Sequence, residues 1–310
     1  MKTFSIVIPV YFNEPNLPNT VPQLLALGKT LKEYQLELVF VDDGSGDRSL
    51  ETLLDFQKKY PEIIKVVKLN RNFGSMAAIQ AGLTIARGDC IGIIAADLQD
   101  PPELFVDMIS HWEKGIKTIF AVRKNREDGK ISNFFSKAYY ALIRRFAIPH
   151  YPSGGFDFFL ADKQVVREVN KINEKNTNLM SLVFWLGYSS VLIPYVRRKR
   201  EKGISRWTFS KKFKLFIDSF VAFSYVPIRF LSGLGLLVAA SAFLYGGFVL
   251  FTWFTSGIAV KGFTALMILL TLTSGIQMTM LGVLGEYLWR TLDETRRRPH
   301  YVIDQIFGEK

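Results

Sequence analysis

Residues 36–45 read Leu-Glu-Leu-Val-Phe-Val-Asp-Asp-Gly-Ser, an apolar run that ends in two adjacent carboxylates and a glycine turn. Short runs of this kind, rich in β-branched residues, are typical of buried strands. Similar runs occupy residues 4–10, 63–69, 90–96 and 118–122. Helical patterns separate them at residues 17–34, 49–60, 75–87 and 101–114. This alternation predicts an α/β fold of βαβ units with a mainly parallel sheet.

Polar side chains follow each of the first four predicted strands. They are Tyr11, Asn13 and Glu14; Asp42, Asp43 and Ser45; Arg71 and Asn72; and Asp97, Gln99 and Asp100. Ligands of parallel sheets bind beyond the carboxyl ends of the strands. One polar loop is ordinary turn chemistry, and a turn role suits Asp43, but four loops at one edge predict a binding site.

The 310-residue chain carries 39 Lys and Arg against 28 Asp and Glu, a formal net charge of +11. This excess predicts anionic partners, namely nucleic acid, phosphorylated metabolites or acidic lipids. The single cysteine, Cys90, excludes an intramolecular disulfide and a cysteine-cluster zinc site. An apolar content of 49% excludes a disordered chain.

Two long uncharged stretches lie in the last third of the chain, at residues 230–254 and 262–285. Each exceeds the roughly 20 residues that a helix needs to cross a bilayer core, so we expect a transmembrane hairpin. A buried hairpin of a soluble protein is the alternative, but two such runs are hard to bury in a small domain. Gly235 with Ala239, and Ala242 with Gly246, have the spacing of closely packed membrane helices, which favours a homo-oligomer.

Basic residues flank the two stretches on one side. Residues 197–214 contain nine basic residues and one acidic residue, and Arg290, Arg296, Arg297 and Arg298 follow the second stretch. The connecting loop carries only Lys261. The positive-inside rule therefore predicts a multi-pass protein of the plasma (inner) membrane with both termini in the cytoplasm. Because the basic residues flank membrane spans, nucleic acid is not an expected partner.

Two amphipathic stretches combine an aromatic stripe with basic residues. They lie at about residues 130–146 and at 209–227, the second directly before the first span. Either stripe could face a protein core. Their basic faces beside a membrane span favour helices that lie among the headgroups of anionic lipids.

Four motifs, in order, support a resemblance to a known family. They are SIVIPVYFNE at residues 5–14, VDDGS at 41–45, RNFG at 71–74 and ADLQDPPE at 96–103. Together they resemble family 2 glycosyltransferases with the Rossmann-like GT-A fold, of the dolichyl-phosphate mannose synthase and bactoprenol glucosyltransferase type. REKGISRW at residues 200–207 extends the likeness, which covers about residues 4–227.

The resemblance implies both an organisation and a reaction. We expect a GT-A domain at residues 1–208, a juxtamembrane helix at 209–227, two spans within 228–289 and a cytoplasmic tail at 290–310. The implied reaction is the inverting transfer of a hexose from a nucleotide sugar to a polyprenyl phosphate of the undecaprenyl type. UDP-glucose is the expected donor because the hairpin is similar to that of the glucosyltransferase branch, while GDP-mannose and a modified pentose donor stay open.

The resemblance also assigns residues to the nucleotide sugar. They are Pro9, Tyr11, Glu14, Asp42, Asp43, Arg71, Asp97, Arg200, Ser205 and Arg206. Tyr11 can stack on a base, and carboxylates can accept hydrogen bonds from ribose or base. A buried tyrosine and turn-capping aspartates are the structural alternatives. Asp157 and Asp97 are implied as catalytic residues, Asp157 by orienting the acceptor or a sugar hydroxyl.

The expected metal site departs from the family pattern. Where the family has Asp-x-Asp, this chain reads Ala95-Ala96-Asp97, so one carboxylate is missing. Asp97 and Gln99 remain as oxygen ligands, and Mg²⁺ needs few protein ligands when diphosphate and water complete its octahedron. We therefore expect dependence on Mg²⁺ or Mn²⁺, with weaker metal affinity in the absence of nucleotide. An inactive enzyme is the alternative.

Charge determines the remaining chemistry. A lipid monophosphate is already an oxyanion near neutral pH, so the site needs no strong general base but must suppress repulsion between two phosphates. We expect Arg123 and Arg126 to serve the acceptor phosphate. Arg197 and Arg198 are expected to form a charge belt at the inner leaflet instead.

Two other functions compete with this interpretation. A processive polysaccharide synthase carries Gln-x-x-Arg-Trp, but here Gly203 stands where that motif has Gln, and two spans are few for a polymer channel. A non-catalytic membrane scaffold that kept the fold is favoured by the missing carboxylate at Ala95. The scaffold function is opposed by the presence of Asp97, Gln99, Arg200, Ser205 and Arg206.

Overall fold

The computed structural model describes residues 1–124, 139–152, 155–156, 158–172, 174, 177–198, 218, 221, 223–224, 226–256 and 262–308. The chain divides into two compact units. The first comprises Met1–Ser219 and Pro299–Lys310, and the second comprises Phe220–Arg298. The first is an α/β unit, and the second contains a pair of long helices.

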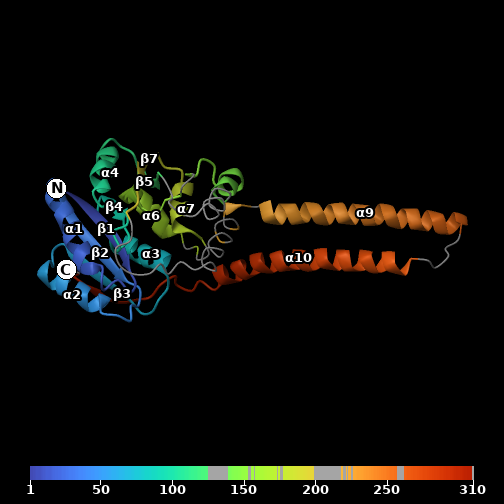
Figure 1. Ribbon diagram of the computed structural model, residues 1–310, viewed down its shortest axis with the longest axis horizontal. Helices are drawn as coiled ribbons and strands as arrows, with labels where there is room; N and C mark the ends of the chain where they lie inside the picture. The colour runs from blue at the N-terminus through green and yellow to red at the C-terminus, as the bar shows by residue number, and fades with distance from the viewer. Residues whose placement is uncertain are drawn as a thin grey trace. The chain divides into compact units, whose positions relative to one another are not determined.

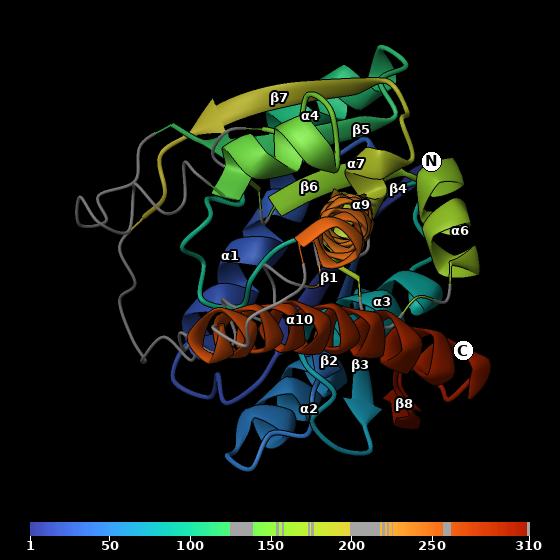
Figure 2. The ribbon, with the colours of Figure 1, turned by 90° about the vertical axis from the view of Figure 1, so that its right-hand side faces the viewer.

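Within the described residues, the α/β unit is built on an eight-stranded sheet in the order β7-β5-β6-β4-β1-β2-β3-β8. The strands are β1 (Lys2–Val10), β2 (Tyr34–Asp42), β3 (Ile64–Leu69), β4 (Cys90–Ile93), β5 (Thr118–Arg123), β6 (Phe158–Asp162), β7 (Ser190–Tyr195) and β8 (Ile303–Phe307). Only β6 and β8 run antiparallel to their neighbours. Figure 2 shows β7 at one end of the sheet and β8 at the other. The predicted α/β class with a mainly parallel sheet is confirmed.

Helices cover both faces of this sheet (Figure 1). They are α1 (Leu17–Thr30), α2 (Ser49–Lys59), α3 (Ser75–Ile85), α4 (Leu104–Glu113), α6 (Lys163–Lys171) and α7 (Leu179–Trp185). Ile6 and Ile8 of β1 join one core with Phe105 of α4. Val7 between them faces α3, where a Cβ added to Gly82 would lie 2.3 Å from a Val7 methyl group. Because both faces are covered, β1 is apolar at consecutive positions rather than at alternate ones.

Several predicted boundaries differ from those observed. The predicted helix at residues 17–34 ends at Thr30, because Tyr34 already begins β2. The predicted strand at 90–96 ends at Ile93, and the predicted helix at 101–114 begins at Leu104. In both cases the extra residues form the loops at the ends of these elements. The remaining strands, β6 to β8, were not predicted.

The C-terminal residues complete the sheet rather than forming only a tail. β8 pairs antiparallel with β3, and Lys68 Nζ lies 2.6 Å from Asp304 Oδ2. Beyond the end of β3, the Asn70 amide donates a hydrogen bond to the Val302 carbonyl (3.0 Å). The region expected to be a cytoplasmic tail at residues 290–310 therefore includes an edge strand of the α/β unit.

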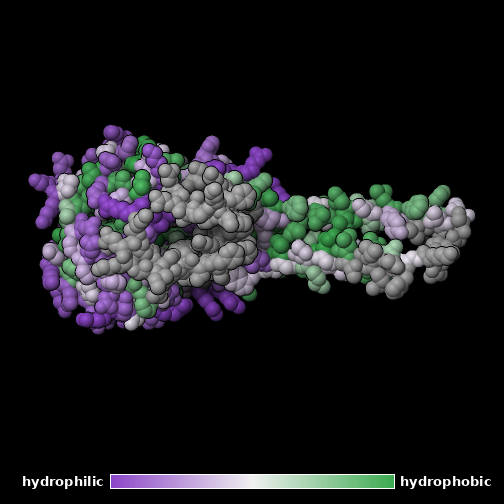
Figure 3. All heavy atoms as spheres, viewed as in Figure 1, coloured by the Kyte–Doolittle hydropathy of each residue, from purple (hydrophilic) through white to green (hydrophobic). Residues whose placement is uncertain are grey.

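The second unit contains α9 (Val226–Ser256) and α10 (Phe263–Thr295). Within the described part of the chain, Val226–Phe248 is long and apolar enough to cross a membrane, with a mean hydropathy of 1.7. Figure 3 shows hydrophobic residues over much of the visible surface of α9, and Phe243 is 84% exposed. The second expected span lies within α10 and stays a prediction. The two predicted amphipathic helices fall largely outside the described residues. Residues 139–146 of the first are helical, and the end of the second, at 226–227, belongs to α9.

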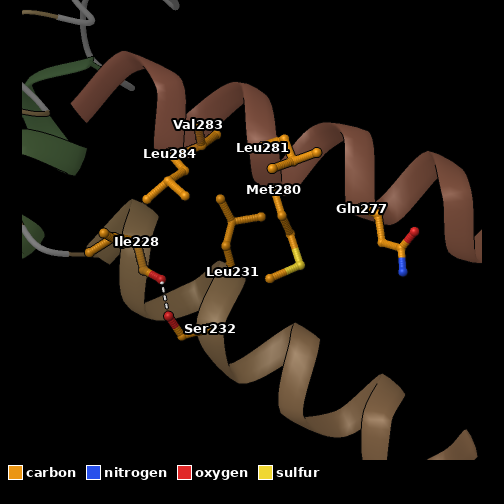
Figure 4. Close-up of a pocket in the computed structure, with 8 residues that line it drawn as sticks. All are labelled: Ile228, Leu231, Ser232, Gln277, Met280, Leu281, Val283 and Leu284. Atoms are coloured by element: carbon orange, nitrogen blue, oxygen red, sulfur yellow. Dashed lines mark hydrogen bonds between the residues drawn. The ribbon is translucent and has the colours of Figure 1, made fainter. Parts of the chain in front are cut away.

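An apolar groove separates part of α9 from α10 (Figure 4). Ile228 and Leu231 of α9 face Met280 and Leu284 of α10, and the groove has a volume of about 450 Å³. The Ser232 hydroxyl donates a hydrogen bond to the Ile228 carbonyl of its own helix (2.9 Å). This serine therefore contributes little polarity to the groove.

Candidate functional site

Those predicted site residues that the structure describes lie at the carboxyl edge of the sheet, where the order of the strands changes direction. The chain adds β2 and β3 on one side of β1 and β4 on the other. Ligands of open α/β sheets bind in the crevice at such a switch point. Pro9, next to the last residue of β1, pairs with Val41, and Tyr11 directly follows that strand. Asp97 follows β4, so Tyr11 and Asp97 flank the switch point.

The loops after β1 and β2 are joined by hydrogen bonds. The Phe12 amide donates to Ser45 Oγ (3.1 Å), and the Asn13 amide donates to Ser49 Oγ (2.9 Å). In the opposite direction, the Arg48 amide donates to Glu14 Oε2 (3.1 Å). The Glu14 carboxylate, predicted to bind the nucleotide, thus also holds these two loops together.

The loops after β2 and β3 are equally close. Asp43 Oδ1 accepts a hydrogen bond from the Phe73 amide (2.7 Å), and Oδ2 accepts one from the Gly74 amide (2.9 Å). Gly44 has φ +68°, and a Cβ there would lie 2.7 Å from the Arg71 carbonyl carbon. Only glycine suits both the left-handed conformation and this approach. The structure therefore brings Asp43 and Arg71 to one place, with Asp43 holding the turn.

Asp42 has an unsatisfied oxygen. The residue is 1% exposed, and its Oδ2 accepts a hydrogen bond from the Ser45 amide (3.3 Å). Its Oδ1 has no hydrogen-bond partner among the described residues. Burial raises the pKa of Asp42, and burial likewise raises the pKa of Asp43. Because a buried carboxylate oxygen without a donor is costly, Asp42 Oδ1 is suited to a ligand N–H or O–H group.

Backbone strain occurs in two of the candidate loops. Phe12, after β1, has φ 53°, and Leu98, after β4, has φ 47°. Large non-glycine residues rarely adopt such φ values, and residues with such strained backbones cluster at ligand-binding sites. Tyr11 and Phe12 form an edge-to-face ring pair at 4.7 Å, and the Arg71 guanidinium lies 4.1 Å from the Phe73 ring centroid. The loops therefore present aromatic and cationic surfaces suited to a base and a phosphate.

The side-chain oxygens of Asp97 and Gln99 suit a hard divalent cation only if a bound ligand supplies the other coordinating atoms. Asp97 and Gln99 lie in one short loop, in which the Gln99 backbone amide donates a hydrogen bond to Asp97 Oδ1 (3.3 Å). Among the described residues, no group of three or more His, Cys, Asp or Glu could hold a metal. One carboxylate and one amide oxygen fit Mg²⁺ or Mn²⁺ when a diphosphate and water supply the remaining ligands.

A second cluster lies at the same edge, where β5 and β7 end. Arg123 pairs with Tyr195 in the parallel register of these strands. The Tyr195 hydroxyl donates to Asp100 Oδ1, and Arg123 hydrogen-bonds the same phenol. Burial, aided by Asp100, raises the pKa of Tyr195, so this phenol stays protonated and donates. We call Asp100, Arg123, Tyr195 and Arg197 the Asp100 cluster.

Sequence reasoning did not foresee this cluster. Tyr195 follows a strand that was not predicted, and no motif points to it. Arg197 and Arg198 were expected in a membrane charge belt, but Arg197 Nε lies 3.4 Å from Asp100 Oδ1 and Arg198 Nη2 lies 3.0 Å from Glu103 Oε2. The signal that could have found the cluster is the presence of two further acidic residues, Asp100 and Glu103, after Asp97 in the motif at 96–103.

The remaining predicted site residues lie outside the described residues. They are Arg126, Asp157, Arg200, Ser205 and Arg206. Their assignments stay predictions.

Comparisons with known proteins agree with the motifs. Residues 5–170 match the model of Glycosyl transferase family 2. The uncharacterized glycosyltransferase YkcC of Bacillus subtilis is 37% identical over 309 residues, which is 98% of this chain and 94% of that protein. The prophage bactoprenol glucosyl transferase homolog of Escherichia coli is 33% identical and covers 97% of this chain and 98% of its own. The bactoprenol glucosyl transferase of Shigella phage SfV is 32% identical, over 96% and 97% respectively.

Proposed function

Because the chain belongs to glycosyltransferase family 2, and is therefore a glycosyltransferase, we propose that it transfers glucose from UDP-glucose to a polyprenyl phosphate, with inversion. The observation that carries this proposal is the extent of the likeness to bactoprenol glucosyl transferases. Those relatives match 96–97% of the chain, which includes α9 and α10 as well as the α/β unit. A likeness confined to residues 5–170 would fit many acceptors.

The loops after β1, β2 and β3 form the nucleotide site in this proposal. Asp42 Oδ1, which is buried without a partner among the described residues, accepts a hydrogen bond from the base or ribose. Tyr11 stacks on the base, and Arg71 lies near the diphosphate. Pro9 and Glu14 shape the wall of the site, since Glu14 joins the first two loops. Asp43 holds the third loop in place through its two backbone hydrogen bonds.

Asp97 and Gln99 hold a divalent cation together with the donor diphosphate in this proposal. When bound, Mg²⁺ or Mn²⁺ neutralises charge that develops on the leaving diphosphate. Arg123, at the end of β5, attracts the acceptor phosphate, with Arg126 as a second cation. The acceptor is already ionised, so the chain has to position two anions in line rather than remove a proton.

The helical unit anchors the enzyme where the acceptor resides. α9 is apolar enough to span a bilayer, and we propose that α10 provides a second span. The basic residues before α9 and after α10 support a cytoplasmic location of the α/β unit in this proposal, by the positive-inside rule. A polyprenyl phosphate then reaches the site by lateral diffusion.

The test uses the full chain in vesicles that contain undecaprenyl phosphate. With radiolabelled UDP-glucose and Mn²⁺ or Mg²⁺, we expect label in the organic-extractable lipid, and we expect EDTA to abolish it. GDP-mannose and a UDP-pentose, added in parallel, identify a different donor. Asp97→Ala is the matched inactive control.

Four results would contradict the proposal. Label from GDP-mannose or a UDP-pentose alone would show a different donor. A long water-insoluble polymer would show a processive synthase. No transfer from any donor would indicate a scaffold that kept the fold. An α-linked glucosyl lipid, detected by glycosidase digestion, would refute inversion, since the donor is an α-glucoside.

A further inference from the structure

Asp100 is a buried acid that the proposed reaction does not use. It directly follows Gln99 and is 1% exposed. Its Oδ1 accepts a hydrogen bond from the Tyr195 hydroxyl (2.5 Å) and lies 3.4 Å from Arg197 Nε. A carboxylate buried to this degree persists only with such partners. The two partners come from the end of β7, 95 residues or more along the chain.

Backbone contacts reinforce this connection. The Arg198 amide donates to the Gln99 carbonyl (2.8 Å), and Gln99 Nε2 donates to the Arg198 carbonyl (3.4 Å). The Lys124 amide donates to the Tyr195 carbonyl (2.8 Å), which ties β5 to β7 just beyond Arg123. The loop after β4 is thus fastened to the ends of two other strands.

The loop needs such fastening because its backbone is strained. Leu98, two residues before Asp100, has φ 47°, and conformations of this kind persist only where the surroundings enforce them. Leu98 lies between Asp97 and Gln99, the two expected metal ligands. If the loop relaxed at Leu98, the oxygens of these two side chains would move relative to each other.

We propose that Asp100 is a positioning residue that fixes the loop bearing Asp97 and Gln99 relative to Arg123. This inference rests on the proposed function, because it assigns the donor diphosphate to the loop and the acceptor phosphate to Arg123. The buried Asp100 carboxylate belongs to the loop that bears Asp97 and Gln99, and the Tyr195 hydroxyl connects it to Arg123. The separation of the two anionic reactants is therefore set by a group that touches neither.

The experiment measures metal-dependent nucleotide binding by the full chain in detergent. UDP is titrated calorimetrically without metal and at increasing Mn²⁺, and GDP is titrated in parallel. The variants are Asp100→Asn, which removes the charge at constant size, and Tyr195→Phe, which removes only the hydroxyl. Glu37→Gln is the matched control, because Glu37 forms another buried ion pair, with Lys65 Nζ at 2.7 Å in the middle of the sheet.

We expect Asp100→Asn to raise the Mn²⁺ concentration for half-maximal UDP binding by about 10–100-fold, the usual effect of removing a group that orients a metal ligand. Binding of UDP without metal should change by less than about twofold, because that binding depends on the other loops. Tyr195→Phe should shift the metal dependence in the same direction. Glu37→Gln should lower the melting temperature but leave the metal dependence unchanged.

Equal Mn²⁺ dependence in wild type and folded Asp100→Asn would overturn the proposal, since Asp100 would then serve stability alone. If Asp100→Asn does not fold, an unchanged metal dependence in Tyr195→Phe overturns it instead. A shift in Glu37→Gln as large as that in Asp100→Asn would also overturn it. Wild-type protein that binds UDP with Mn²⁺ but glucosylates no lipid would contradict the proposed function, while the shift in Asp100→Asn would still support the positioning role.

Discussion

Gly44→Ala tests the close approach of the loops after β2 and β3. Gly44 has φ +68°, where an alanine costs about 1–2 kcal/mol. Its Cβ would lie 2.7 Å from the Arg71 carbonyl carbon and 2.8 Å from the Asn72 nitrogen. Both are backbone atoms, so the collision cannot be relieved by turning a side chain.

The collision requires the two loops to separate. Ordinary van der Waals contact begins at 3.4 Å, so the Arg71 backbone must move by about 0.7 Å. Overpacking of this kind costs about 1–3 kcal/mol. With the conformational strain, the total is about 3 kcal/mol, or roughly 6–12 °C in melting temperature for a domain of this size.

Two other glycine substitutions separate the cost of the left-handed backbone conformation from the cost of the steric collision. Gly115 has φ +92° with nothing within 4 Å of an added Cβ, so Gly115→Ala should cost only the strain of about 1–2 kcal/mol. At Gly46 the added Cβ would meet only the tip of the Phe12 ring at 3.2 Å, so Gly46→Ala should cost less than about 0.5 kcal/mol.

The assays are thermal unfolding and calorimetric UDP binding. We expect Gly44→Ala to weaken UDP binding by about tenfold or more, because Arg71 and the partners of Asp43 move with the loop. The Gly115 and Gly46 variants should bind UDP like wild type. The reasoning is refuted if Gly44→Ala melts within 2 °C of Gly115→Ala, roughly the effect of 1 kcal/mol or less, and binds UDP normally.

Two further predictions concern Asp42 and the C-terminal strand. Burial raises the pKa of Asp42, so the folded state holds this proton more tightly than the unfolded chain, and stability is lost as pH rises from about 4 through the folded pKa. Asp42→Asn should therefore raise the melting temperature at pH 7 relative to wild type but not at pH 3, and a lower melting temperature at pH 7 would contradict this. The same change should weaken UDP binding by about 10–100-fold, because a hydrogen bond to a charged group contributes ~1.5–3 kcal/mol. Deleting residues 299–310 should lower the melting temperature and weaken UDP binding, because β3 becomes an unpaired edge and Asn70 loses the Val302 carbonyl. As the control, Asp304→Asn removes only a half-exposed ion pair with Lys68, so it should cost about 0–1 kcal/mol of stability and leave UDP binding unchanged. If Asp304→Asn and the deletion had equal effects, loss of strand pairing would not be the cause of the lower stability and weaker binding.

Local sequence was sufficient for the first four strands and for the polar residues that follow them at one edge of the sheet. Short runs rich in β-branched residues favour buried strands, and the carboxyl ends of parallel strands meet at one edge of the sheet. Tyr11, Asp42 and Asp97 were therefore placed at that edge from their position after a strand. The apolar stretch of α9 was equally readable, because its length and lack of charge are properties of the segment alone.

Contacts between distant segments needed the tertiary structure. β8 pairs with β3 although the two strands are more than 230 residues apart, and nothing in residues 303–307 marks them as a partner for that edge. The turn role of Asp43 was foreseen, but its bonds to the Phe73 and Gly74 amides were not.

The Asp100 cluster shows the same limit at the site. Asp100 lies within a motif, but Tyr195 and Arg197 follow a strand with no motif of its own. A residue's type and spacing predict its secondary structure and its chemistry. Its partners depend on which strands become neighbours, and that order is decided by the packing of the whole sheet.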